Sequence, residues 1–246
     1  MKRNIQLIIE YDGTRYCGWQ SQKNGLSIED TIRSAIEETT GRQVKLIGSG
    51  RTDARVHAYG QSANFMTEST IPAEKMAYAI NDRLPEDICI LKSKEVSEDF
   101  HSRYHAQKKE YEYRIVNRVM RSPLYRNRAW VVKYPKIQVD VMKEAAQYFV
   151  GEHDFTAFCA ANTTVESKIR NIEGITLVQN GDDLRIQVKG NGFLYNMVRI
   201  MVGTLVDFGV KNRDPREMEE ILAGKDRKRA GVTAPPQGLY LKKVYY

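Results

Sequence analysis

The stretch NIQLIIEYDG, residues 4–13, starts the fold of this chain. Apolar side chains stand at every second position from Ile5 to Tyr11, which is the period of a β-strand with one face buried. The Asp12-Gly13 pair that follows favours a turn. We therefore expect a strand near the N-terminus that enters a sheet and reverses after residue 13.

The elements that follow predict a βαββαβ order, the split βαβ or ferredoxin-like arrangement. A helix comes next, because Ser27 with Asp30 resembles a capping box and Gly41 supplies a stop. The pattern then predicts strands at 44–47 and 61–66, a helix opened by Pro72, and a strand at 88–96.

The second half repeats this order approximately. We expect strands at 111–115 and 130–133, a helix that carries Met142 and stops at Gly151, a hairpin of 175–178 and 184–188 around Asn180-Gly181, a helix with the stripe Leu194, Val198, Met201 and Leu205, a short helix after Asp214-Pro215, and a last strand at 239–244. The expected fold class is α+β, with two ferredoxin-like halves whose antiparallel sheets form a central cleft. We place the halves at residues 1–107 and 108–246.

Composition limits the class of protein. The 246 residues are 41% hydrophobic and 28% charged, which is typical of a globular chain, and the net charge of +7 favours a polyanionic partner such as nucleic acid. The cysteines Cys17, Cys89 and Cys159 are too far apart in sequence to suggest a disulfide framework or a thiolate metal site. No apolar run approaches the ~18 residues of a membrane span, so we expect a cytoplasmic protein without membrane association.

The densest cluster of chemically capable residues is GSGRTDARVHAYG, residues 48–60. Its glycines allow close approach of the backbone to a ligand, and Asp53 stands between Arg51 and Arg55, which would hold its carboxylate ionised. Such an aspartate suits nucleophilic or base chemistry on a phosphate-bearing substrate. On composition alone, a surface turn with a solvated ion pair is favoured; a phosphate-cradling loop is less well supported, because no Lys-Ser/Thr pair follows the glycines.

Within this cluster, residues 50–58 closely resemble the catalytic motif of the tRNA pseudouridine synthase A family. Further motifs that resemble this family follow its order along the whole chain, at residues 10–22, 84–88, 99–103, 109–113, 151–158, 191–199 and 233–241. The resemblance implies isomerisation of uridines 38, 39 and 40 in the anticodon stem-loop of tRNA to pseudouridine, with no metal or organic cofactor. It also implies a homodimer.

The resemblance assigns catalytic roles by matching position. Asp53 would be the catalytic aspartate, and Arg199 would pair with it and keep it charged. Tyr111 would stack on the target base and take part in a proton step, with Tyr113 on the same strand face as its competitor. Leu239 would pack against the uracil.

Three further residues are expected to bind the substrate. Arg51 would occupy the place of the flipped-out base or hold its phosphate, because a stem uridine must leave the stack before it can react. Arg55 could supply a phosphate contact near it, although for any one such residue a plain surface charge is the more common role. His57 is expected to serve structure or RNA contact. Arg55 stands where the family usually has Gly, so either the backbone angles there are ordinary or the loop differs locally.

Other interpretations stay open. The same chemistry could act on a different RNA, and the βαββαβ order is also that of a non-catalytic tandem RNA-recognition protein, although residues 59–66 lack the RNP1 pattern and 184–188 contain no aromatic residue. His101 and His105 have a spacing that could seat a metal on a helix, but no third ligand is near in sequence, so we expect no metal site.

Overall fold

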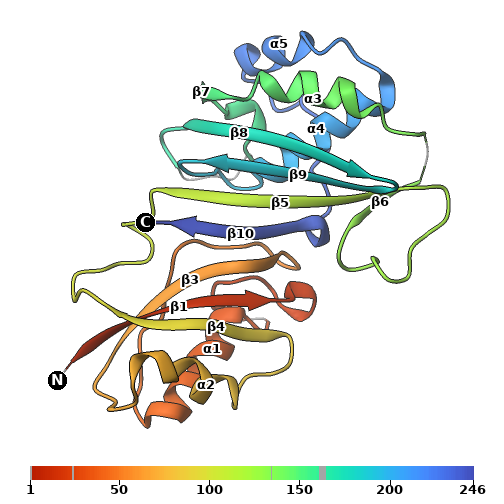
Figure 1. The fold of residues 1–246 in the computed structure, drawn as a ribbon. Coiled ribbons are helices and arrows are strands. Elements are labelled where there is room, and N and C mark those ends of the chain that lie inside the picture. The colour runs from red at the N-terminus through yellow and green to blue at the C-terminus, as the bar shows by residue number, and fades with distance from the viewer. Residues whose placement is uncertain (1, 24, 134, 161–164) are drawn as a thin grey trace. The chain divides into compact units, whose positions relative to one another are not determined.

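The computed structural model describes residues 2–23, 25–133, 135–160 and 165–246. The chain divides into two compact units: unit 1 contains the chain up to Gln107 together with Tyr240–Tyr246, and unit 2 contains Lys108–Leu239. Both combine helices with β-strands, so the predicted α+β class is confirmed (Figure 1). The sequence pattern places residues 240–246 in the second half, whereas the structure groups them with unit 1.

Unit 1 is a sheet with two helices. Its elements are β1 (Arg3–Tyr11), the 3₁₀ turn η1 (Gly13–Arg15), α1 (Ile28–Thr40), β2 (Ile47–Gly48), β3 (His57–Thr67), the 3₁₀ turn η2 (Ala73–Lys75), α2 (Met76–Asn81), β4 (Ile88–Val96) and β10 (Leu239–Tyr245), which enters the unit at Tyr240. The sheet order is β4-β1-β3-β10, with β2 paired to β3. β1 is antiparallel to β3 and β4, and β10 is parallel to β3. From β1 to β4 the elements follow the predicted βαββαβ order (Figure 1).

Helix α1 begins and ends where the local sequence predicts. The Ser27 hydroxyl accepts a hydrogen bond from the main-chain N–H of Asp30 at 3.0 Å and donates one to its carboxylate at 2.6 Å. Gly41 ends the helix with φ of 70°, a left-handed conformation that suits glycine. Between them Ile28 and Ile32 are fully buried, and each such side chain contributes roughly 1.5–3 kcal/mol of hydrophobic stabilisation.

Two strands of unit 1 differ from their predicted limits. The strand expected at 44–47 is reduced to β2, where Gly48 lies so close to Trp19 that an added Cβ would be 2.5 Å from the indole ring. β3 starts at His57 and not at residue 61, because Ala58 pairs with β1 on one side and with Leu241 of β10 on the other. The end of the 48–60 motif is therefore strand and not loop.

Unit 2 repeats the first unit only in part. Its elements are β5 (Lys108–Asn117), β6 (Trp130–Val132), α3 (Val139–Gln147), β7 (Gly151–Asp154), the 3₁₀ turn η3 (Thr156–Phe158), β8 (Ile169–Asn180), β9 (Asp183–Gly190), α4 (Met197–Lys211), α5 (Glu217–Gly224) and the 3₁₀ turn η4 (Pro236–Gly238). The strands are ordered β5-β9-β8-β7, and β6 runs parallel to β5 at its other side. Within the described ranges of the chain, no helix is long and apolar enough to cross a membrane.

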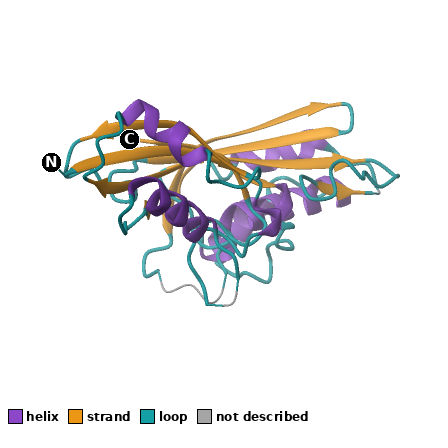
Figure 2. Cartoon of the chain, turned by 90° about the horizontal axis from the view of Figure 1, so that it is seen from below, coloured by secondary structure: helices purple, strands orange, loops and turns teal. Residues whose placement is uncertain are grey.

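The predicted hairpin of unit 2 is confirmed and is longer than expected. Asn180 pairs with Asp183 across the turn, where Gly181 has φ of 57°. Figure 2 shows the helices and strands of the chain in separate colours. Two neighbouring predictions need correction. Gly151, expected as the stop of α3, has φ of 104° and begins β7, and Leu194 precedes α4 because the left-handed Asn196, with φ of 62°, starts the helix at Met197.

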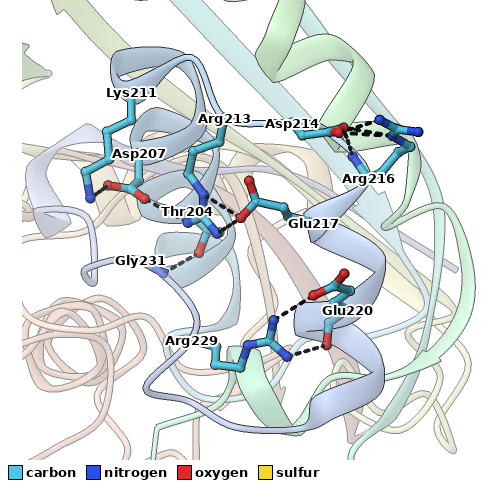
Figure 3. Close-up of polar contacts among 10 residues, drawn as sticks. All are labelled: Thr204, Asp207, Lys211, Arg213, Asp214, Arg216, Glu217, Glu220, Arg229 and Gly231. Carbon is cyan, nitrogen blue, oxygen red and sulfur yellow. Dashed lines mark hydrogen bonds and ion pairs between the residues drawn. The ribbon is translucent and has the colours of Figure 1, made fainter.

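Ion pairs join the end of α4 to α5 (Figure 3). Arg213 lies 3.0 Å from Asp207 of α4 and 2.6 Å from Glu217 of α5. Lys211 adds a second contact to Asp207 at 2.6 Å. The network fixes the loop between the two helices, and α4 is the helix that carries Arg199.

Candidate active site

The predicted catalytic aspartate lies in the segment between β2 and β3, which we call the aspartate loop (residues 48–57). Arg51 and Arg55 are exposed, whereas Asp53 is half-buried. The main-chain N–H of Val56 donates to the carbonyl of Asp53 at 3.2 Å and closes a tight turn around it. The loop therefore presents two guanidinium groups to solvent around a partly enclosed carboxylate.

Gln61 holds the start of the aspartate loop. Its side-chain oxygen accepts a hydrogen bond of 2.6 Å from the buried hydroxyl of Ser49, and its side-chain nitrogen donates to the carbonyl of Gly50 at 3.0 Å. Because Gln61 belongs to β3 and is itself fully buried, the loop leaves the sheet from a fixed point.

A second segment supports the middle of the aspartate loop, and we call it the framing segment (residues 11–19). The N–H of Trp19 donates to the carbonyl of Thr52 at 3.0 Å, and the hydroxyl of Tyr11 lies 2.8 Å from that of Thr52. The carbonyl of Tyr16 accepts from the N–H of Arg55 at 3.3 Å. These bonds flank Asp53 on both sides, so its backbone is positioned by residues far away in sequence.

Two glycines allow the framing segment to approach this closely. Gly18 has φ of 113°, and a Cβ there would lie 2.6 Å from the carbonyl oxygen of Thr52. A Cβ on Gly13 would overlap the carbonyl oxygen of Val56. Both glycines are needed for contact between main chains, which is why the turn after β1 contains them.

His57 is built into unit 1. Its side chain is buried, its Nδ1 accepts a hydrogen bond of 3.1 Å from the N–H of Gly13, and its ring stacks on Tyr240 at 4.7 Å between centroids. Asp12 Oδ1 lies 3.2 Å from the same Nδ1. His57 thus connects the end of the aspartate loop to the framing segment and to β10.

In unit 2, Arg199 lies in the first turn of α4 and is partly buried. Its Nε donates to the carbonyl of Ala234 at 2.7 Å, and its Nη1 donates to the side-chain oxygen of Asn196 at 2.8 Å. The segment around Ala234 is seated on the same helix, because the N–H of Gly231 donates to the Thr204 hydroxyl at 2.9 Å (Figure 3). The guanidinium is thereby held in a defined orientation at the start of α4.

The two candidate tyrosines of β5 have different surroundings. Tyr113 is fully buried and donates its hydroxyl to the carbonyl of Pro235 at 2.6 Å. Burial raises the pKa of Tyr113 well above its ordinary value of 10.0, and nearby Arg199 opposes part of this effect. Tyr111 is 9% exposed, and its ring meets Phe193 edge-on at 5.1 Å. The hydroxyl of Tyr113 is therefore engaged with the main chain inside the core of unit 2.

Leu239 ends the segment that Tyr113 supports. The preceding Gly238 lies so close that a Cβ would be 2.6 Å from the Tyr113 ring, and Leu239 itself is 6% exposed. The carbonyls of Pro235 and Ala234 accept hydrogen bonds from Tyr113 and Arg199, respectively. The sequence assigned no role to these two residues, although both lie in the 233–241 motif, which could have indicated one.

The predicted site residues thus fall into two groups. Unit 1 brings together Arg51, Asp53, Arg55 and His57 on one loop and the strand that follows it. Unit 2 contains Tyr111, Arg199 and Leu239. Arg199 is bonded to Ala234 in the segment that ends at Leu239, whereas the ring of Tyr111 contacts Phe193. Each group is ordered within its own unit by the contacts described above.

The histidines considered for a metal have local partners. His101 Nδ1 accepts from the N–H of Arg103 at 3.1 Å, and its ring stacks on Tyr104 at 4.2 Å. His105 Nδ1 lies 3.4 Å from the N–H of His101. Among all the side chains that the structure describes, no group of three or more His, Cys, Asp and Glu is arranged to hold a metal ion.

Comparison with known proteins identifies relatives along the whole chain. The sequence model of the family described as tRNA pseudouridine synthase matches residues 7–105 and 145–246. A protein named tRNA pseudouridine synthase A from Thermoanaerobacter sp. (strain X514) is 48% identical over 244 residues, which cover 99% of this chain and 100% of the relative. A protein of the same name from Ruminiclostridium cellulolyticum is 49% identical over 245 residues, with the same coverage of both chains.

A solved structure, described as a Cbf5-Nop10-Gar1 complex, also matches. The match covers 96% of this chain and 57% of that chain, at 12% sequence identity and a TM-score of 0.37. This similarity is too low to carry an argument about fold or function.

Proposed function

We propose that this chain, which belongs to the tRNA pseudouridine synthase family, acts on uridines 38, 39 and 40 of the anticodon stem-loop of tRNA. Membership makes the chain an isomerase that converts uridine in tRNA to pseudouridine. The three positions follow from the resemblance of its motifs, and the roles of individual residues below belong to the same proposal.

The reaction rearranges one nucleotide without oxidation or reduction. The C1′–N1 bond breaks, the base turns within the site, a C1′–C5 bond forms, C5 gives up its proton and N1 receives one. Substrate and product contain the same atoms at the same oxidation state, so the reaction needs no co-substrate. We propose that one ionised carboxylate acts as nucleophile or base, without a metal or organic cofactor. Asp53 attacks the base or the sugar, or removes a proton from the sugar.

The assignment of Asp53 rests on the hydrogen bonds that hold its loop in place. The loop is bonded at its start to Gln61 and at its middle to Trp19 and Tyr16. A catalytic group must be held within a fraction of an ångström of its productive position, because a misplacement of 1 Å costs about 10²-fold in rate. A surface turn with a solvated ion pair would not need these hydrogen bonds from distant residues.

Unit 2 would supply the remaining groups. We propose that Arg199 pairs with Asp53 and that Tyr111 stacks on the target base, while Tyr113 serves the core. Leu239 would pack against the uracil. The chain itself supports this: the peptide bond between Leu239 and Tyr240 joins the two units, and Tyr240 pairs with His57 at the end of the aspartate loop.

The exposed arginines of the aspartate loop would bind the RNA. Extrusion of a stem uridine costs a few kcal/mol, and Arg51 would offset this cost by filling the vacated place or by holding the phosphate. Arg55 would make a phosphate contact beside it. His57 would act on the RNA indirectly, because its buried ring is bonded to Gly13.

The remaining expectations concern location and assembly. We propose a homodimer that works in the cytoplasm. Sedimentation velocity would measure the oligomeric state. Membership of an enzyme family excludes the alternative that the chain is a non-catalytic tandem RNA-recognition protein. The alternative of a different RNA substrate is an outcome of the experiment below.

The test is incubation with an unmodified tRNA transcript, followed by chemical mapping of pseudouridine. We expect modification at positions 38 to 40 by the wild-type protein and none by Asp53→Asn, because the amide cannot act as nucleophile or base. Filter binding should show nearly unchanged tRNA affinity for Asp53→Asn, since binding comes from many phosphate contacts.

The matched control is Asp82→Asn, which changes an exposed aspartate of unit 1 in the same way. It should retain wild-type activity. Pseudouridine outside the anticodon arm would point to a different RNA site, and activity in Asp53→Asn would overturn the assignment of the catalytic residue.

A further inference from the structure

The framing segment forms several hydrogen bonds with one residue outside it, Asp87. Asp87 directly precedes β4, and its Oδ1 accepts a hydrogen bond of 2.7 Å from the hydroxyl of Tyr16. Its Oδ2 lies 2.7 Å from Arg15 Nε, and its main-chain carbonyl accepts from the N–H of Asp12 at 2.9 Å. Three parts of the framing segment therefore depend on Asp87.

Tyr16 is the buried member of this group. Its side chain is 2% exposed, and burial followed by the hydrogen bond to Asp87 raises the pKa of Tyr16 above its ordinary value of 10.0. The hydroxyl therefore keeps its proton at neutral pH and donates it to the carboxylate. A buried hydroxyl that loses its acceptor is destabilising, so the position of Tyr16 depends on Asp87.

From Tyr16 the contact continues to the aspartate loop through the main chain. Its carbonyl accepts from the N–H of Arg55 at 3.3 Å, and the turn closed by Val56 and Asp53 includes Arg55. Asp53 thus lies in a turn that is bonded to Tyr16, and Tyr16 is bonded to Asp87. The three residues form one continuous path within unit 1.

We propose that Asp87 is a positioning residue for Asp53. Its carboxylate acts through Tyr16 and the framing segment, and it keeps the aspartate loop in the geometry that the reaction requires. The inference rests on the proposed function, because positioning matters only if Asp53 is the reacting group. With a side chain 18% exposed and committed to Tyr16 and Arg15, Asp87 acts on the loop and not on the RNA.

The first experiment measures pseudouridine formation over a range of tRNA concentrations for Asp87→Ala, Asp87→Asn and Tyr16→Phe. We expect kcat to fall about tenfold or more in Asp87→Ala and in Tyr16→Phe. Asp87→Asn should lose less, because an amide oxygen can still accept from Tyr16. KM should stay within about twofold of wild type, since the phosphate contacts are untouched.

The matched control is Glu86→Gln. Glu86 is the exposed neighbour of Asp87, and the substitution removes the same charge without touching Tyr16. Its kcat and KM should equal those of the wild type. A loss in Glu86→Gln as large as in Asp87→Asn would show that charge near the RNA, and not positioning, is the cause.

The second experiment is hydrogen exchange on the free protein, which needs no activity. Peptides covering residues 50–57 should exchange faster in Tyr16→Phe, which keeps the buried ring, while peptides covering α1 keep wild-type protection. Unchanged exchange at 50–57, loss of protection across unit 1, or a kinetic loss carried by KM would each overturn the proposal. A wild-type protein without activity would overturn the proposed function instead.

Discussion

Arg55 has a backbone conformation that is uncommon for its residue type. Its φ is 65°, in the left-handed region, where a residue with a β-carbon is less stable by about 1 kcal/mol than in an ordinary conformation. The sequence left open whether this position has ordinary angles or a local difference. The structure shows the conformation that suits glycine, held by the bond from Arg55 to Tyr16.

Because the conformation disfavours arginine, we expect its side chain to matter for binding and not for folding. Arg55→Gly should raise the free energy of unfolding by about 1 kcal/mol, as the strain is removed. The same variant should bind tRNA several-fold more weakly, because a phosphate contact is lost. Urea unfolding and filter binding measure the two effects.

Arg55→Ala separates strain from charge. Alanine keeps the strained conformation and removes the guanidinium, so this variant should bind as weakly as Arg55→Gly without its gain in stability. Wild-type affinity in both variants would mean that Arg55 makes no contact with the RNA.

At the scale of elements, the junction of α4 and α5 has a charge network with a defined response to pH. Burial by itself would raise the pKa of Asp207, but hydrogen bonds from Lys211 and Arg213 outweigh it, and the pKa lies below its ordinary value of 3.8. A carboxyl whose pKa is lowered by folding stabilises the folded state above its unfolded pKa. That contribution is lost as the pH falls through the folded pKa.

We therefore expect Asp207→Asn to be less stable than wild type at pH 7 and at pH 5. The difference should shrink as the pH falls below about 3.8, because wild type then loses the same interaction. Urea unfolding at a series of pH values measures it. Asp140→Asn, on the exposed surface of α3, should change stability little, and a pH-independent deficit in Asp207→Asn would contradict the role of its charge.

At the scale of the whole molecule, the chain returns to unit 1 after it has built unit 2. Tyr240 and Leu241 pair with the first residues of β3, and the Tyr240 ring stacks between His57 and Tyr59 at 4.7 Å from each. The last strand therefore completes the sheet whose β3 begins where the aspartate loop ends.

Deletion of residues 240–246 should consequently destabilise unit 1. We expect a fall in the unfolding temperature of more than about 5 °C and faster hydrogen exchange at residues 57–61, because β3 loses a partner strand and two ring contacts. The control is Tyr246→Phe, which keeps the strand and removes only a hydroxyl, with its hydrogen bond to the carbonyl of Ser102. Unchanged exchange at 57–61 after the deletion would show that β10 adds nothing to the support of β3.

Much of the fold could be predicted because its signals are local. Ser27 and Gly41 bound α1 through contacts within one helical turn, and Asn180-Gly181 forms the hairpin turn through its own backbone angles. The motif around Asp53 identified the family for the same reason, since it lies in consecutive residues.

Other features depend on residues that are distant in sequence. No local pattern shows that β10 pairs with β3. None shows that Tyr113 donates its hydroxyl to the carbonyl of Pro235, or that Tyr16 donates its hydroxyl to Asp87. These contacts exist because folding brings separate elements together and buried polar groups must then find partners. The order of elements and the carboxylate that we propose as catalytic are thus determined by local sequence. The support of the loop around Asp53 arises in the tertiary structure, where the framing segment contacts the aspartate loop and is itself bonded to Asp87.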